Sequence, residues 1–448
     1  MASVNSAYIN IHIDNLIIAT VYFHRKCQEH EKILFYHPNS KDIDTQVRHI
    51  GLAEAITRFC STFNKTSDCE SVHTQKTHQV LFQPEPNIWM VMTIGVGWVT
   101  RQRDTGPVRE YQSEGVQDSV LKANLINLYR AFTLQHASYS HVLAEGDVDS
   151  LRSTIRDFFS SYISLVDLSC GDIINIWSGV SFLPLDRQTF LRIHCCLSLL
   201  QASHPCIKHT AFFYNSSVVW KLGNSNMQKL SKFLIGNIYL KFIKKKCEGA
   251  LKNSTRFLGS GPTPSLRIFL KENHTLEPNP HHLLVYTLAG ATICLTMLED
   301  EKLTPILFEK IDRLLETKVS QLASDIGEQT NKKSSGSSSN DHSSSSGQFR
   351  YVYHNHMNLA TKTTLPGTST TIPPEVMKTI ADMHEDIKKC CSSELVVKTS
   401  HDHWLIVFGA KRGQLFAITC FKRLNLIYCN EVNRMCNSHF SNIFMVEI

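Results

Sequence analysis

The sequence predicts an α/β protein of three similar domains, each an antiparallel sheet with helices packed on it. Its 448 residues correspond to about three domains at roughly 150 residues each. A serine-rich tract at 334–347 cannot bury apolar surface and predicts a flexible linker. One order of strands and helices also recurs three times, which predicts domains at 1–168, 169–333 and 348–448.

The first domain begins with two predicted strands, one with alternating isoleucines at 9–13 and one at 32–37. A helix is expected next, because apolar residues recur at three- and four-residue spacing. Its sheet-facing side is predicted to carry Ile43, Val47, Ile50, Ala53, Ile56, Phe59 and Phe63. Strands at 71–82 and 88–94 and helices at 119–135 and 149–165 complete the first domain.

The second domain repeats this order. A hairpin is predicted at 210–222 around Asn215-Ser216-Ser217, followed by a helix at 227–244. Strands are expected at 256–259 and 266–270, and a second hairpin turns at Ala289-Gly290. A last helix should start at Pro305, with Thr304 as its cap, and stop at Gly327.

The third domain opens with a predicted strand at 350–354. Pro373-Pro374 then starts a helix whose apolar face is expected to hold Val376, Ile380, Met383, Ile387 and Cys391. Strands at 395–399, 404–409 and 414–419 follow, and a final helix is expected near Asn430.

The composition excludes several classes of protein. A net charge of +6, with 42% hydrophobic and 19% charged residues, argues against disorder, a coiled-coil rod and dedicated nucleic-acid binding. The opening residues lack the basic and apolar regions of an export signal, so the 14 cysteines are expected to be reduced and mostly packed. The uncharged run Leu283–Leu298 is too short for a membrane span and reads as a buried hairpin.

The sequence carries no recognisable catalytic motif. It has no phosphate-binding loop, dinucleotide fingerprint, G-x-S-x-G or H-E-x-x-H. The pairs His354/His356 and His401/His403 lack a third ligand, so we predict no metal site and no cofactor. A Cys/His hydrolase that uses Cys60 or Cys69 stays open, because pairing in space cannot be read from sequence.

A basic run ends the helix predicted at 227–244, with its cations at Lys241, Lys244, Lys245 and Lys246. Such a run suits the negative end of the helix dipole and can also contact anionic lipid. A solvated helix end is the other interpretation of these four lysines.

Several blocks, in matching order, resemble the Ccz-one family, the calcium-caffeine-zinc sensitivity proteins. In the first domain they are KILFYHPN (32–39), IGLAEAI (50–56), VHTQK (72–76) and NIWMVM (87–92). Later blocks are VSFLPLD (180–186), TAFFYN (210–215), LASDIGEQ (322–329), HNHMNLA (354–360) and FSNIF (440–444). The resemblance extends from about residue 31 to the end, but is not firm at 95–116 or in the serine tract.

The resemblance implies three longin domains and a function without covalent chemistry. The family forms one half of the heterodimeric Mon-one/Ccz-one guanine-nucleotide exchange factor for the late-endosomal GTPase Rab-seven, which promotes endosome-to-lysosome maturation, fusion and autophagy. Its implied partners are a Mon-one-like longin subunit, the Rab-seven GTPase, an anionic membrane surface and a possible third regulatory subunit, with no nucleic acid. The expected location is cytoplasmic, with peripheral recruitment to late endosomes, lysosomes and autophagosomes.

The resemblance further implies that the first domain holds the GTPase and partner surface. The candidates are Gly51, Leu52 and Glu54 on the predicted helix and His73, Thr74, Gln75 and Lys76 on the strand after it. Each could instead be structural: Leu52 could be a core residue and Thr74 could only pair strands. Two other functions stay open, a related Hermansky–Pudlak or inturned-type complex subunit and a non-catalytic trafficking scaffold.

Overall fold

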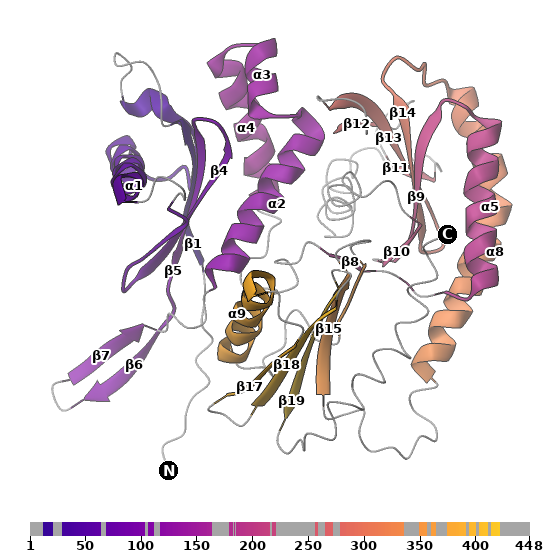
Figure 1. The fold of residues 1–448 in the computed structure, drawn as a ribbon. Coiled ribbons are helices and arrows are strands. Elements are labelled where there is room, and N and C mark those ends of the chain that lie inside the picture. Colours follow the sequence, from indigo (N-terminus) through magenta and orange to yellow (C-terminus); the bar gives the residue numbers. More distant parts are fainter. Residues whose placement is uncertain are drawn as a thin grey trace. The chain divides into compact units, whose positions relative to one another are not determined.

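The computed structural model shows a mixed α/β chain (Figure 1). It forms two compact units, residues 1–178 with 367–381 and residues 179–366 with 382–448. The residues that the structure describes are 12–20, 29–63, 69–103, 106–111, 117–163, 179–181, 183, 185–215, 217–220, 256–258, 265–271, 278–335, 349–355, 360–363, 374–390, 394–399, 403–410 and 414–421. The predicted strand start at 9–11, the helices at 227–244 and near Asn430, and the linker at 336–347 lie outside them.

The first domain is built on a five-stranded antiparallel sheet with the order β2-β1-β5-β4-β3. Its strands are β1 (His12–Thr20), β2 (Ile33–His37), β3 (Ser71–His73), β4 (Thr77–Glu85) and β5 (Ile88–Gly95). A short 3₁₀ turn, η1 (Glu29–Lys32), leads into β2. Every residue of the central strand β5 is buried, so both faces of the sheet are covered.

Helices cover the two faces separately (Figure 1). α1 (Ile43–Phe63) packs Ile50 and Ala53 against Ile17, Trp89 and Val91 on one face. α2 (Asp118–His136), α3 (Tyr139–Glu145) and α4 (Val148–Ile163) lie on the other. There the hydroxyl of Tyr139 lies 3.7 Å from the sulfur of Met90, and the rings of Phe35 and Phe159 are 5.7 Å apart.

One buried carboxylate joins the end of β4 to the helical layer. Glu85, only 8% exposed, accepts hydrogen bonds from the hydroxyl of Tyr129 at 2.7 Å and from the backbone N–H groups of Tyr139 at 2.6 Å and Ser140 at 2.8 Å. These bonds satisfy a buried charge and two amides at the start of α3. The pKa of Tyr129 is raised well above its usual range by burial and by this contact.

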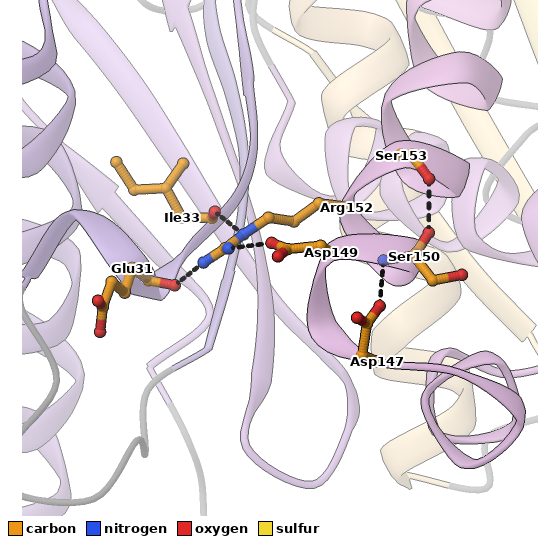
Figure 2. A network of polar contacts seen from close by, with 7 residues as sticks. All are labelled: Glu31, Ile33, Asp147, Asp149, Ser150, Arg152 and Ser153. Carbon is orange, nitrogen blue, oxygen red and sulfur yellow. Dashed lines mark hydrogen bonds and ion pairs between the residues drawn. The ribbon is translucent and has the colours of Figure 1, made fainter.

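Arg152 holds α4 against the edge of the same sheet (Figure 2). Its guanidinium donates to the backbone carbonyls of Glu31 and Ile33 and pairs with Asp149 at 2.8 Å. β2 is the outer strand of the sheet. Arg152 therefore joins α4 to η1 and to the first residue of this edge strand.

A two-stranded hairpin follows the sheet, β6 (Trp98–Arg103) and β7 (Gly106–Tyr111). It falls in the region where the sequence showed no firm family resemblance. Arg109 lies over the ring of Trp98, 4.3 Å from its centroid, and Arg101 pairs with Glu110 at 2.6 Å. The sequence analysis did not predict this hairpin.

The second domain repeats the order of the first sheet, β10-β9-β14-β13-β11, with β12 also paired to β13. Its strands are β9 (Ile207–Tyr214), β10 (Ser217–Trp220), β11 (Phe257–Leu258), β12 (Leu266–Leu270), β13 (Asn279–Leu288) and β14 (Ala291–Leu298). The predicted turn at Ala289-Gly290 is confirmed, because both residues adopt positive φ, 49° and 83°.

Two helices pack on this sheet, α5 (Arg187–Ser203) and α8 (Pro305–Ser335). α5 was not predicted. The Thr304 cap is confirmed, since its hydroxyl accepts from the N–H of Leu307 at 3.3 Å. The predicted stop at Gly327 is wrong: α8 continues two residues into the serine tract, and Gly327 instead lets the Tyr214 hydroxyl approach, 3.1 Å from where a Cβ would be.

Two of the resembling blocks meet where α5 and α8 pack together. Asp186 caps α5 by accepting from the N–H of Thr189 at 3.0 Å, and Gln329 on α8 donates to Asp186 and to the Thr189 hydroxyl. These hydrogen bonds, with the backbone N–H of Thr189 foremost, hold the pKa of Asp186 below its usual value. VSFLPLD and LASDIGEQ are therefore structural blocks at these positions.

The third sheet has the order β17-β18-β19-β15-β16-β8. Its elements are β15 (Phe349–Asn355), β16 (Ala360–Thr363), α9 (Pro374–Cys390), β17 (Glu394–Lys398), β18 (His403–Ala410) and β19 (Gln414–Phe421). Counted from the first strand of each domain, with β11 and β12 taken as one position beside β13 and β8 left out, all three sheets have the order 2-1-5-4-3. Val376, Ile380, Met383 and Ile387 of α9 are buried, which confirms its apolar face.

One strand of the third sheet comes from far upstream. β8 (Val180–Ser181) pairs in parallel with β16, although residues 180–181 were assigned to the second domain. Gly179 fits beside the Thr361 side chain, where a Cβ would clash. The third sheet therefore includes a strand that lies far upstream in the sequence.

Among the described residues, no helix combines the length and the apolar character needed to cross a membrane. The run Leu283–Leu298 forms β13, its turn and β14, as expected.

Replacing Glu85 with Ala should lower the free energy of unfolding by about 2–4 kcal/mol, because buried donors lose their acceptor. Chemical denaturation monitored by tryptophan fluorescence would measure this. Glu145→Ala is the matched control, since Glu145 is exposed and only pairs with His141 at 3.8 Å. Equal stability of the Glu85 and Glu145 variants would contradict the role assigned to Glu85.

The first domain should lose stability as the pH falls below about 6.5. Burial lowers the pKa of His37, His49 and His78 from 6.5, so the unfolded chain binds protons more readily than the folded one. The stabilisation is complete above pH 6.5 and is lost as the pH falls through the lowered values. Hydrogen exchange of β1 and β5 at pH 7.5 and 5.5 tests this, and pH-independent protection would refute it.

Candidate functional site

The outer side of α1 presents an apolar stripe to solvent. Leu52 is 56% exposed, Phe59 64% and Phe63 77%, and the two phenylalanine rings touch edge to face at 4.8 Å. An aromatic side chain buries about 150–250 Å² when it packs in a core or an interface. A contiguous exposed group of this kind is a typical feature of protein interaction sites.

The structure corrects the helix face predicted from sequence. α1 has the predicted bounds, but only Ile50 and Ala53 are buried among its residues, and Ile43 is also exposed. Nine residues separate Ile50 from Phe59, a rotation of roughly 900° at 100° per residue, which places them on opposite sides. Phe59 and Phe63 are thus surface residues that the sequence analysis took for core.

Gly51 has no structural reason to be glycine. It lies inside α1, and a Cβ placed on it would have no atom within 4 Å. Glycine costs a helix roughly 0.5–1 kcal/mol relative to alanine. The residue leaves bare backbone next to Leu52, where another molecule could approach closely.

Glu54 is engaged within the domain. Its carboxylate pairs with Lys32 at 2.9 Å and with Arg58 one helical turn later, and its side chain is largely buried. Glu54 therefore ties α1 to the start of β2. A structural role accounts for it fully.

The other four candidates belong to the β3–β4 hairpin and not to one continuous strand. His73 ends β3, and the next three residues form the turn before Thr77. The hydroxyl of Thr74 accepts from the N–H of Thr77 at 2.9 Å and from that of Lys76 at 3.3 Å. Thr74 holds the turn, while Gln75 and Lys76 are exposed at its tip.

The two groups of candidates do not come together. Glu54 contacts the β2 side of the sheet, whereas His73 lies in β3, and these strands are the opposite edges. His73 also contacts Asp118 of α2, on the face away from α1, so the structure describes two surfaces instead of one platform.

Four of the described cysteines have a raised pKa. Burial raises the pKa of Cys69 to about 11, aided by the neighbouring Cys60, and it also raises the pKa of Cys196, Cys206 and Cys294. A nucleophilic cysteine needs a lowered pKa. The hydrolase interpretation therefore loses one of its two candidates.

Comparison with known proteins identifies the family. Residues 16–137 match the family model described as the first Longin domain of INTU, CCZ1 and HPS4. Residues 207–316 and 345–435 match Intu longin-like domains 2 and 3. The vacuolar fusion protein CCZ1 homolog of Xenopus laevis is 32% identical, with 94% of each chain covered. The chain belongs to the CCZ1 family.

Relatives from other organisms have the same name. The CCZ1 homolog of Nematostella vectensis is 33% identical over 97% of this chain and 98% of its own. That of Dictyostelium discoideum is 23% identical over 92% and 93%. The Ccz-one resemblance and the three longin domains are thereby confirmed, and each family model lies within one repeat of the 2-1-5-4-3 sheet order.

Changing Gly51 to Ala should raise the free energy of unfolding of the isolated chain by about 0.5–1 kcal/mol, because helix propensity improves without a clash. Urea denaturation measures it. Gly146→Ala is the control: its Cβ would meet Ser150 at 3.1 Å, so no gain is expected there. A less stable Gly51 variant would show that this backbone position has a constraint inside the chain.

Proposed function

We propose that the chain is one subunit of a heterodimeric guanine-nucleotide exchange factor for a late-endosomal Rab GTPase, Rab-seven, and that it acts in fusion with the lysosome or vacuole and in autophagy. CCZ1-family membership supports the fusion role, since the relatives are named vacuolar fusion proteins. The observation that carries the subunit role is the exposed stripe Leu52, Phe59 and Phe63 beside Gly51. A Mon-one-like longin subunit is the proposed partner on this stripe.

Exchange of this kind requires no acid, base or nucleophile, so we propose no enzyme chemistry and no cofactor. A factor that binds the open GTPase better than the nucleotide-bound form weakens the hold on nucleotide reciprocally. Each 1.4 kcal/mol of preference for the open form can speed release up to about tenfold. Surfaces of fixed shape are sufficient for this mechanism.

We assign the two surfaces different contacts. The stripe on α1 is apolar and suits a permanent partner, because obligate interfaces are more hydrophobic than transient ones. The exposed turn residues Gln75 and Lys76, on a hairpin fixed by Thr74, are polar and suit the transient contact with the GTPase. Peripheral recruitment from the cytoplasm to late-endosomal, lysosomal and autophagosomal membranes would use Lys241, Lys244, Lys245 and Lys246, which lie outside the described residues.

The nucleotide-release assay tests the function directly. Rab-seven loaded with a fluorescent GDP analogue should release it faster with the chain and its Mon-one-like partner together than with either alone. Gln75→Ala combined with Lys76→Ala should slow release by the complex without weakening the pairing. Full activity of the isolated chain would contradict the heterodimer, and an inactive complex would favour a scaffold or an inturned-type subunit.

The pairing surface is tested by polar substitution of the stripe. Phe59→Ser with Phe63→Ser should weaken binding of the partner about thirtyfold, the effect of a hot spot worth roughly 2 kcal/mol. Leu143→Ser is the matched control, since Leu143 is an exposed leucine on α3, outside the stripe. Equal partner binding by both variants, measured by surface plasmon resonance, would remove the stripe from the interface.

A further inference from the structure

Three side chains that can bind a metal converge at the edge of the first sheet. His73 ends β3, His78 follows the turn in β4, and Asp118 is the first residue of α2. One ligand atom from each lies within 4.8 Å of the other two. The sequence analysis missed this cluster because Asp118 is 40 residues from His78 in the chain.

The spacing of these atoms suits a transition-metal ion. The Nε2 atom of His73 is 2.6 Å from Oδ2 of Asp118, and Nδ1 of His78 is 3.7 Å from Oδ1. Ligands about 2.05 Å from a tetrahedral zinc ion are about 3.3 Å apart. The two observed separations bracket that value.

The inner part of the cluster contains buried polar atoms that make no hydrogen bond. His78 is 3% exposed, yet its Nδ1 atom and Oδ1 of Asp118 are buried with no hydrogen bond between them or to any other described residue. Buried polar atoms are nearly always satisfied. The two imidazoles stack at 4.0 Å with 12° between their planes. Because a metal ion lies in the plane of each imidazole that binds it, one of the two rings must turn out of this stack when the ion binds.

The outer part of the cluster is accessible. The His73 side chain is about half exposed, and Asp118 is partly exposed. An ion can therefore enter from solvent and retain a water or another ligand. Two imidazoles and one carboxylate with an open position form a donor set that Zn²⁺ and similar borderline ions accept.

We propose that His73, His78 and Asp118 bind one divalent transition-metal ion, Zn²⁺ or an ion of similar chemistry, which links the β3–β4 hairpin to the start of α2. The ion replaces the direct contact between His73 and Asp118, and it gives Nδ1 of His78 a bond in place of its 3.7 Å contact with Asp118. This site revises the expectation that the chain has no metal site. It does not depend on the proposed exchange function, because the test below contains no GTPase.

Cobalt titration of the full chain tests the site. After treatment with a chelator and its removal, CoCl₂ should bind at one site with the ligand-field absorption of a four- or five-coordinate ion, and ZnCl₂ should displace it. His73→Ala and Asp118→Asn should each weaken this binding by at least about tenfold. His73 is largely exposed, so its variant should keep the wild-type circular dichroism spectrum.

The matched control is His141→Ala. His141 is also a partly exposed histidine beside a carboxylate, Glu145 at 3.8 Å, but this pair is not part of the three-residue cluster. Its removal should leave the cobalt spectrum and affinity unchanged. A wild-type chain that binds no cobalt, or a His73→Ala variant that binds cobalt like the wild type, would overturn the proposal and indicate binding at scattered surface histidines.

Discussion

Complete burial of the central strand β5 is the constraint on which the first domain depends. Each of its residues is buried, and its side chains alternate between two faces, so each face needs a helical layer. α1 supplies one layer through Ile50 and Ala53, and α2, α3 and α4 supply the other. Because only Ile50 and Ala53 of α1 are buried, the outer side of the helix is available for another protein.

The polar contacts fix these layers at few points. Glu85 connects the end of β4 to the start of α3, and Arg152 connects α4 to the carbonyls near β2. The carboxylate of Glu54 connects α1 to Lys32, just before β2. Each of these contacts joins segments that are distant in sequence, and the outer side of α1 and the β3–β4 turn are exposed to solvent.

The sequence allowed the repeated architecture to be predicted well, because strand alternation and helix periodicity are local properties. α1, β5, α2 and the Ala289-Gly290 turn lie where the pattern indicated. The predictions were wrong where apolar residues lie on more than one side of a helix, as at Phe59. They were also wrong where a turn interrupts a strand-like run, as at Thr74. Of the candidate site residues, Gly51 and Leu52 lie at the exposed surface, whereas Glu54 and Thr74 have structural contacts that no pattern could reveal.

The sequence by itself determined three αβ domains with one repeated order of elements along the chain, the CCZ1-family resemblance and the lack of familiar catalytic motifs. Only the tertiary structure decided which apolar residues face solvent, that residues 180–181 complete the third sheet, and that His73, His78 and Asp118 share one site. The physical reason is that periodicity fixes the direction of a side chain relative to its own element. What lies in that direction depends on packing between segments that are far apart in the chain.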